Sequence, residues 1–203
     1  MMRAASIIRH GGVVAHPTET FYGLAADPFS EQAVARIRAL KGREAAQAIL
    51  LLLPHTEAIH DLARLPPAAR GWFDLLARAF WPGPLTLILP ARRDLSCPAL
   101  AGGETVALRL SSHPVAWQLA RMVGAAITST SANPSGATPP ASAEALDPMI
   151  ARGVDLVVDG GATPGGRPST LLDLTGERPR IVRAGAVPAE DLTRVLGFPP
   201  RSA

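Results

Sequence analysis

The chain has 203 residues, 47% of them apolar and 18% charged, which is enough for one substantial hydrophobic core and predicts a single domain over residues 1–203. Its formal net charge of +3 is compatible with phosphate-bearing partners such as a nucleotide or RNA, but it is too small to indicate nucleic acid by itself. The single cysteine, Cys97, excludes an intramolecular disulfide and a zinc site built on cysteines, and no apolar stretch has the length of a signal peptide or a membrane span, so we expect a cytoplasmic protein.

The first half of the chain predicts helices that alternate with buried strands. In chain order, the expected elements are a helix that ends at Arg9 before Gly11 and Gly12, a strand at 13–16, a polar loop at 18–24, a helix from an N-cap at Ser30 to Gly42, a strand at 49–53 and a short helix at 56–63. The polar loop holds two threonines, a carboxylate and the only tyrosine of the chain, a composition that is typical of functional loops.

The second half predicts more strands than helices. The expected elements are a helix at 66–80, strands at 85–89 and 105–110, a helix at 114–123, a strand at 125–128, a hydroxyl-rich loop at 129–136, a helix from a cap at Ser142 through Ile150, a strand at 155–158, a glycine-rich connection at 160–168, strands at 169–174 and 180–183, and a helix at 188–196. With about seven strands interspersed with helices, the chain predicts an α/β or α+β fold built on a mixed sheet. Its core should run from about residue 6 to 197, with a short tail at 198–203.

The strand at 105–110 alternates cleanly between apolar and other side chains. Val106, Leu108 and Leu110 share one face of this strand. Arg109 must therefore point to the opposite face, which favours a position in a cleft.

Lys41 is the only lysine in the chain, because the other 19 of the 20 Lys and Arg residues are arginines. Two interpretations are open. A compact ammonium on a flexible stem suits contact with phosphate, whereas a planar guanidinium suits flat, bidentate partners. The residue before Gly42 could also simply end a helix, where a cation is favoured by roughly a few tenths of a kcal/mol.

Some known catalytic motifs are excluded by single residues. Residues 161–168 resemble a P-loop, but Arg167 and Pro168 replace its lysine and its metal-binding hydroxyl. The segment from Ser131 to Asn133 resembles a β-lactamase element, yet the only lysine is not preceded by serine at the required spacing. No Gly-x-Ser-x-Gly elbow is present, so the sequence does not indicate a covalent nucleophile.

The histidines also lack the spacing of metal ligands. The five histidines, at positions 10, 16, 55, 60 and 113, form no i,i+4 pair and have no carboxylate in ligand spacing. We therefore expect no protein-built metal site, although a metal could arrive with a nucleotide.

The remaining candidates are polar side chains on predicted loops and strand ends. Each hydroxyl or amide taken singly could serve a turn or a cap. Taken together they suit the binding of anions and polar ligands, with catalysis by positioning and charge stabilisation. The set is Thr18, Thr20, Lys41, Arg43, Arg109, Ser131, Asn133, Ser169, Thr170 and Arg183.

At these residues the chain resembles the YrdC family of threonylcarbamoyl-AMP synthases. The matching stretches run in the family's order from about Gly12 to Gly185, and seven motifs in register are a strong signal. They are Pro17 to Leu24, Lys41 to Arg43, Trp81 to Thr86, Val106 to Arg109, Ser131 to Gly136, Pro168 to Thr170 and Ile181 to Gly185.

The resemblance implies a twisted mixed sheet, flanked by helices, with a positively charged central cavity for ATP, L-threonine and bicarbonate. In the family's reaction bicarbonate carboxylates the amine of threonine, and the carbamate attacks the α-phosphorus of ATP and expels pyrophosphate. The product serves a partner threonylcarbamoyl transferase, which modifies adenosine 37 of tRNA. Mg²⁺ is expected with ATP, since charge gathers on the phosphate oxygens.

The resemblance also assigns roles to the polar set. Lys41 and Arg43 would be catalytic and would contact the nucleotide phosphates. Ser131, Asn133, Ser169 and Arg183 would join them in binding ATP. The expected threonine-binding residues are Thr18, Thr20, Arg109 and Thr170, of which Arg109 would hold the carboxylate bidentately.

The chain departs from the family after Arg43. Gln47, Ala48 and Leu52 stand where many members have asparagine, proline and a histidine that touches threonine, and Ser111 replaces a proline. Some short members also lack the histidine, and the chain resembles the short, single-domain form. Two alternatives remain: an RNA-binding or ribosome-maturation paralogue with the same cavity, and a carbamoyl-adenylate step on another substrate.

Overall fold

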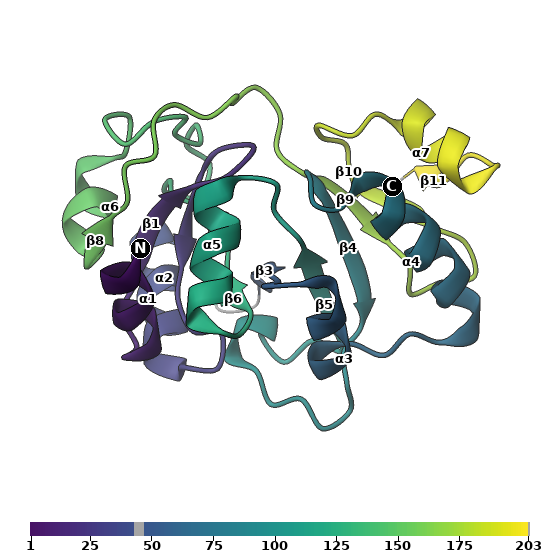
Figure 1. Cartoon of the computed structure of the whole chain (residues 1–203), viewed down its shortest axis with the longest axis horizontal. Coiled ribbons are helices and arrows are strands. Elements are labelled where there is room, and N and C mark those ends of the chain that lie inside the picture. Colours follow the sequence, from purple (N-terminus) through teal and green to yellow (C-terminus); the bar gives the residue numbers. More distant parts are fainter. Residues whose placement is uncertain (43–46, 203) are drawn as a thin grey trace.

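The computed structural model describes residues 1–42 and 47–202, and its strands form two sheets, each with parallel and antiparallel neighbours (Figure 1). The smaller sheet has the order β7 (Thr130–Ser131), β2 (Tyr22–Ala25), β1 (Val14–Pro17) and β8 (Leu156–Val157). The larger sheet has the order β11 (Arg201–Ser202), β10 (Arg180–Arg183), β9 (Thr170–Asp173), β4 (Leu85–Pro90), β5 (Thr105–Arg109), β3 (Leu51–Leu52) and β6 (Ile127–Thr128). The predicted mixed α/β fold is thus confirmed, with its strands divided between two sheets.

Thr128 joins the two sheets. Its strand β6 and strand β7 of the other sheet are separated by Ser129 alone. The Thr128 hydroxyl accepts the Ala26 backbone N–H at 2.8 Å and donates to the Leu24 carbonyl at 3.2 Å, and the Thr128 N–H donates to the Ala26 carbonyl at 3.0 Å. The buried hydroxyl therefore satisfies the backbone where the chain passes from one sheet to the other.

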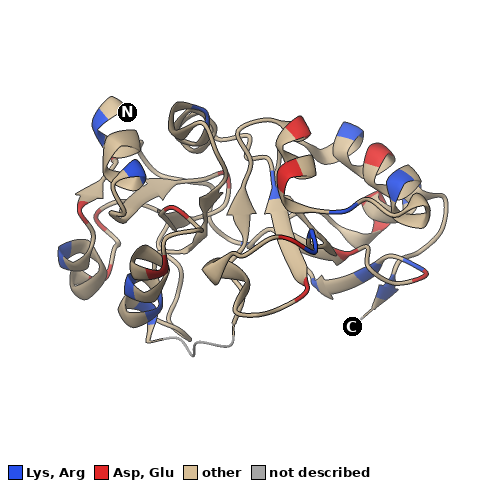
Figure 2. Cartoon of the chain, turned by 90° about the horizontal axis from the view of Figure 1, so that it is seen from below, with Lys and Arg blue, Asp and Glu red and all other residues tan. Residues whose placement is uncertain are grey.

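The helices flank the sheets on several sides, and basic and acidic residues occur in both halves of the molecule (Figure 2). Their bounds are α1 (Met2–Arg9), α2 (Glu31–Lys41), α3 (Ile59–Leu62), α4 (Pro67–Phe80), α5 (Pro114–Val123), α6 (Pro148–Gly153) and α7 (Ala189–Leu196), with short 3₁₀ turns at Thr56–Ala58 and Pro98–Leu100. Helices α1 and α5 pack side by side in the left half of Figure 1, and α4 packs against α7 at the right. No helix of the described residues is both long enough and apolar enough to cross a membrane.

Local capping explains why α2 begins and ends where the sequence predicts. The Ser30 hydroxyl accepts the Ala33 N–H at 3.2 Å, as an N-cap does. Gly42 ends the helix in the left-handed conformation, with φ of +57°, which an L side chain rarely adopts. Lys41 is therefore the last residue of the helix.

The hydrophobic core has two buried clusters. The larger cluster fills the space around both sheets and includes Leu24, Leu85 and Leu108. The smaller cluster packs α1 and α5 against β1 and β6 and includes Leu52. The tail also packs against the core, since Phe198 meets Trp72 edge to face at 6.4 Å between ring centroids.

Part of the loop predicted at 18–24 is a strand. Tyr22–Ala25 forms β2 and pairs antiparallel with β1, with His16 opposite Gly23. Tyr22 and Leu24 are fully buried, so core packing rather than local composition decides this segment. Residues 129–136, also predicted as a loop, contain the two-residue strand β7.

The helix predicted from Ser142 through Ile150 is wrong. The Ser142 hydroxyl only accepts the Ala145 N–H at 3.3 Å, and helix α6 begins at Pro148 with Asp147 as its N-cap. A proline disfavours helical backbone in the residue before it and has no N–H to donate. Pro148 can therefore start a helix but cannot continue one.

Candidate functional site

A cavity of about 560 Å³ lies between residues of the two sheets. Strands β2 and β7 of the smaller sheet line it, together with β5, β9 and β10 of the larger sheet and the end of α2. Its size falls within the roughly 300–1,000 Å³ that is usual for small-molecule sites. The charged residues among its described lining are all cationic: Lys41, Arg109 and Arg183.

The cavity brings together most of the residues predicted from the sequence. These come from segments up to 165 positions apart, Thr18 and Arg183 being the extremes (183 − 18). The predicted residues that line the cavity are Thr18, Thr20, Lys41, Arg109, Ser131, Asn133, Ser169 and Arg183. Arg43 lies outside the described residues.

Thr170 is not brought to the cavity in the described structure. Its side chain is fully buried, and its hydroxyl donates to the Val187 carbonyl at 2.7 Å and accepts the Val187 N–H at 2.9 Å. Its neighbours in the chain, Ser169 and Leu171, do line the cavity. Both hydrogen bonds of Thr170 fasten the segment before α7 to strand β9.

The ammonium of Lys41 is directed at the end of β7 and at the residues that follow it. The residue is 5% exposed, and its Nζ donates to the Ser131 carbonyl at 2.6 Å and to the Asn133 carbonyl at 2.8 Å. In return the Ser135 N–H donates to the Lys41 carbonyl at 2.8 Å. Lys41 thus ends a helix and also holds a positive charge at the cavity wall, so the two interpretations from the sequence are compatible.

Asn133 has an unsatisfied acceptor at the cavity. Its Nδ2 donates to the carbonyls of Pro134 at 2.9 Å and Ala137 at 2.6 Å, which orients the amide. Its Oδ1 is buried and has no hydrogen-bond partner among the described residues. Since a buried acceptor without a partner costs about 1–3 kcal/mol, a ligand hydroxyl or N–H at this position would be stabilising.

The two threonines of the 18–21 segment have different tasks. The Thr18 hydroxyl donates to the Phe21 carbonyl at 2.7 Å and accepts the backbone N–H of Thr20 at 3.2 Å, so it organises the turn. Its one proton is then in use, and Thr20 Oγ1, 3.1 Å away, must be the donor between the two hydroxyls. Thr20 consequently presents acceptor lone pairs to the cavity.

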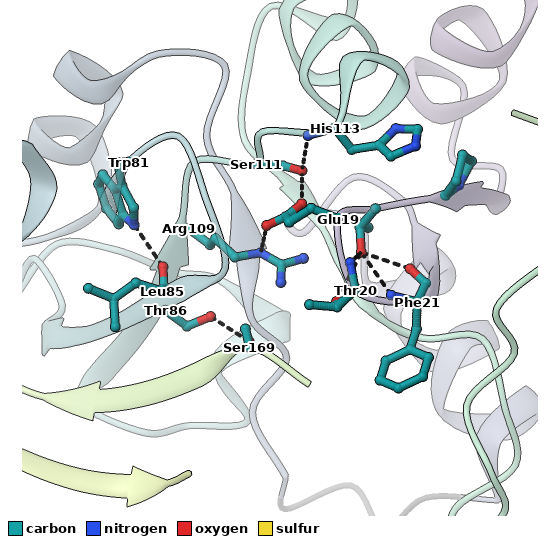
Figure 3. A network of polar contacts seen from close by, with 12 residues as sticks. Glu19, Thr20, Phe21, Trp81, Leu85, Thr86, Arg109, Ser111, His113 and Ser169 are labelled. Carbon is teal, nitrogen blue, oxygen red and sulfur yellow. Dashed lines mark hydrogen bonds and ion pairs between the residues drawn. The ribbon is translucent and has the colours of Figure 1, made fainter. Parts of the chain in front are cut away.

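Ser169 and Arg183 form a second polar wall. The Arg183 Nη2 donates to the Ser169 carbonyl at 2.9 Å and to its hydroxyl at 3.1 Å. The Thr86 hydroxyl also donates to Ser169 Oγ, at 2.9 Å (Figure 3). Ser169 Oγ therefore accepts twice, and its own proton can be donated to an anion in the cavity.

Arg109 is the most deeply buried of the three cations. It is 3% exposed, and its Nε faces Glu19 Oε1 at 3.6 Å, an ion pair that is too long for a hydrogen bond (Figure 3). Burial lowers the pKa of the guanidinium and the Glu19 charge raises it, but arginine stays protonated in either case. Its fork forms no hydrogen bond with another described residue, so it can donate two parallel hydrogen bonds to the carboxylate of a ligand.

Sequence reasoning missed Glu19 and Ser111 as site residues. The Ser111 hydroxyl donates to Glu19 Oε2 and accepts the His113 backbone N–H at 3.2 Å (Figure 3). Residues 19 and 111 are 92 positions apart, so no local pattern could have paired them. The one available signal was Glu19 itself, a carboxylate between two threonines of the site.

The segment that departs from the family pattern faces the cavity through Leu50, which precedes β3, and not through Leu52 of that strand. Leu50 lines the cavity, whereas Leu52 is 1% exposed and packs in the smaller core cluster with Ala116 and Ile127. Leu52 therefore contributes to packing. Gln47 and Ala48, the other two departures, line the cavity.

Fold and cavity together define a mixed α/β domain with a polar cavity whose described charged lining residues are cationic. A family model, Sua5_yciO_yrdC, described as telomere recombination, matches residues 6–185. The chain belongs to the Sua5/YciO/YrdC family, as the resemblance predicted.

Proteins of this family are similar to the chain over nearly its whole length. A threonylcarbamoyl-AMP synthase of Pyrococcus abyssi is 38% identical over 194 residues, 96% of this chain and 56% of that protein. A threonylcarbamoyl-AMP synthase of Thiobacillus denitrificans is 42% identical over 180 residues, 87% of this chain and 91% of that protein. The chain thus spans about half the length of some curated relatives that it matches and most of the length of others.

A solved structure is also similar. The crystal structure of P. abyssi Sua5 complexed with L-threonine has a TM-score of 0.90 and 37% sequence identity to this chain. The match covers 100% of this chain and 58% of that one.

Proposed function

We propose that the chain forms threonylcarbamoyl-AMP and pyrophosphate from L-threonine, bicarbonate and ATP. The observation that carries the proposal is the cavity itself, which is lined both by Arg109, whose fork forms no hydrogen bond with a described residue, and by the hydrogen-bonded pair of Arg183 and Ser169. Two anionic groups are thereby accommodated, a carboxylate and a phosphate. The names of the relatives and the threonine complex of the P. abyssi protein support the same assignment.

Arg109 and Thr20 are proposed to hold the amino acid. The fork of Arg109 would bind the carboxylate of L-threonine, and the acceptor lone pairs of Thr20 would receive a proton from its hydroxyl or its amine. Thr18 would act through the turn that orients Thr20. No role in binding is proposed for Thr170, because its hydroxyl is engaged by Val187.

The nucleotide is proposed to lie against the segment held by Lys41. The Asn133 Oδ1 would accept a ribose hydroxyl, and Ser131, Ser169 and Arg183 would bind phosphate oxygens. Lys41 would place its charge near the α-phosphate, where negative charge accumulates as the carbamate oxygen bonds to phosphorus and the bond to pyrophosphate breaks. Arg43, two residues further on, is proposed to join it.

Mg²⁺ would enter with the nucleotide. The described cavity lining holds no carboxylate, and the described residues include no group of three or more His, Cys, Asp or Glu that could hold a metal ion. The ATP phosphates themselves would therefore be the ligands, and the ion would neutralise part of their charge. The proposed downstream partners are tRNA and a threonylcarbamoyl transferase, and the proposed location of the reaction is the cytoplasm.

The test is pyrophosphate release from ATP and bicarbonate, with and without L-threonine. We expect release that depends on threonine and a product of the mass of threonylcarbamoyl-AMP. Release that is indifferent to threonine would contradict the proposal, because the carbamate of threonine could then not be the group that attacks ATP. No release, together with a salt-dependent RNA affinity that ATP and threonine do not change, would favour the RNA-binding alternative.

A further inference from the structure

Glu19 is the acidic partner of the arginine that would bind threonine. The Glu19 side chain is 11% exposed and the Arg109 side chain 3%, so both charges lie largely out of water. One carboxylate oxygen faces Arg109 Nε at 3.6 Å, and the other accepts a hydrogen bond from Ser111 (Figure 3). The carboxylate of Glu19 is therefore held by Ser111 through the oxygen that does not face Arg109.

The support for Glu19 continues to the start of helix α5. The Ser111 hydroxyl accepts the backbone N–H of His113 at 3.2 Å, and His113 is the N-cap residue of α5. Because the Ser111 oxygen accepts this N–H, its own hydroxyl proton is free to be donated to Glu19. A rigid element thus fixes a serine, the serine fixes a carboxylate, and the carboxylate faces the arginine.

The contact with Glu19 decides which edge of the guanidinium is offered to a ligand. Its Nε side is turned to the carboxylate, so the edge formed by the two Nη atoms is left for the cavity. No other polar contact to a described residue holds this long side chain, and without the contact to Glu19 it could take other rotamers. The paired charge also lowers the effective charge of Arg109, which weakens its attraction for a polyphosphate more than its attraction for a single carboxylate.

We propose that Glu19 is a positioning residue that keeps the Arg109 fork aimed at the cavity and reserves it for a monocarboxylate. The proposal deepens the proposed function and rests on it, because the ligand would be the carboxylate of L-threonine. Lys41 at the end of α2 and Arg183 of β10, which also line the cavity, would then receive the polyphosphate. Glu19 would in this way sort the two anionic substrates between different cations of one cavity.

Three variants separate the contributions. Glu19→Gln removes the charge but keeps an acceptor for Ser111, and Ser111→Ala removes the donor but keeps the charge. The control is Asp155→Asn, which removes the charge that Asp155 places 2.6 Å from another arginine, Arg36. Neither Asp155 nor Arg36 lines the cavity. Calorimetric titration with L-threonine and, separately, with pyrophosphate would be performed on each folded variant.

We expect Glu19→Gln to raise the dissociation constant for threonine by about tenfold, and Ser111→Ala by about threefold, because a misplaced fork loses bidentate geometry. Asp155→Asn should bind threonine as the wild type does. In Glu19→Gln, pyrophosphate should bind more tightly and should displace threonine, a result that a merely structural role would not produce. Unchanged threonine and pyrophosphate binding in folded Glu19→Gln would overturn the proposal. If Glu19→Gln does not fold, unchanged binding of both ligands in Ser111→Ala would overturn it instead.

A second readout separates this proposal from the proposed function. ¹⁵N relaxation of the Arg109 Nε–H group reports the order of the guanidinium without any ligand. We expect an ordered group in the wild type and a mobile one in Glu19→Gln. If the wild type binds no threonine, the proposed function fails, and relaxation that is equal in both proteins would then reject the positioning role as well.

Discussion

Replacing Lys41 by alanine tests the centre of the proposed site. Among the hydrogen bonds that the substitution removes are two short ones from a charged donor, at 2.6 Å to the Ser131 carbonyl and 2.8 Å to the Asn133 carbonyl. Each such bond contributes about 1.5–3 kcal/mol, and relief from burying the ammonium offsets part of this, so we expect a net loss of about 2 kcal/mol in the free energy of unfolding. For a chain of this length the Tm should fall by about 4–8 °C.

The effect of Lys41→Ala on turnover should exceed its effect on stability. Loss of one positioned charge at a developing oxyanion lowers kcat by about 100-fold or more, and the Ser131 to Asn133 segment would also lose its anchor. Lys41→Arg should recover part of the Tm but little of the turnover, since a planar fork in a pocket that leaves 5% of the residue exposed cannot reproduce both contacts. Thermal unfolding and threonine-dependent pyrophosphate release measure the two effects.

Arg38 provides the matched control for Lys41. It lies in the last turn of the same helix and donates to the carbonyl of Pro98 at 2.9 Å, away from the cavity lining. Arg38→Ala should lower the stability by about 1 kcal/mol and leave kcat within about twofold of the wild type. A Lys41→Ala protein with the Tm and the kcat of the wild type would refute the reasoning.

Three further predictions concern stability. Gly185→Ala would place a Cβ 2.3 Å from the Pro168 carbonyl oxygen, so the backbone must shift. Urea denaturation should show that the free energy of unfolding falls by about 3 kcal/mol or more. An unchanged denaturation midpoint would contradict this close approach. Burial lowers the pKa of His16 to about 4 from 6.5, so the stability that the neutral imidazole provides is complete above pH 6.5 and is lost as the pH falls toward 4. Over this pH range the free energy of unfolding should fall by up to about 3 kcal/mol in the wild type and by less in His16→Phe. An equal fall in both proteins would reject the assignment to His16. Ser30→Ala should lower stability by about 1 kcal/mol in the same denaturation assay and Ser30→Asp should not, because only the second keeps an acceptor for the Ala33 N–H.

Elements with strong local signals were predictable nearly to the residue. Helix α2 has a serine cap and a terminal glycine, and α5 begins at a proline and ends before Gly124. These signals act through atoms within one helical turn, so the sequence contains all that decides them. The helix expected after Ser142 failed because Pro148, a stronger local signal than a serine cap, starts the helix instead.

Strands were predicted less well, because their partners are remote. Tyr22–Ala25 reads as part of a polar loop until it is paired with β1 on one side and β7 on the other. The division of the strands into two sheets likewise depends on Thr128, whose hydroxyl bonds to backbone about 100 residues earlier in the chain.

The sequence by itself determined the mixed α/β class, the main helices, and a set of polar residues whose order along the chain resembles one family. Only the tertiary structure decided which of these residues share a cavity: Thr18 and Thr20 do, whereas Thr170 turns to Val187. It also showed that Lys41 is held by two carbonyls and that Glu19 and Ser111 support Arg109. The physical reason is that caps and alternation depend on neighbours in the chain, whereas the acceptors and donors left for a ligand are those that remain after the whole fold has satisfied the others.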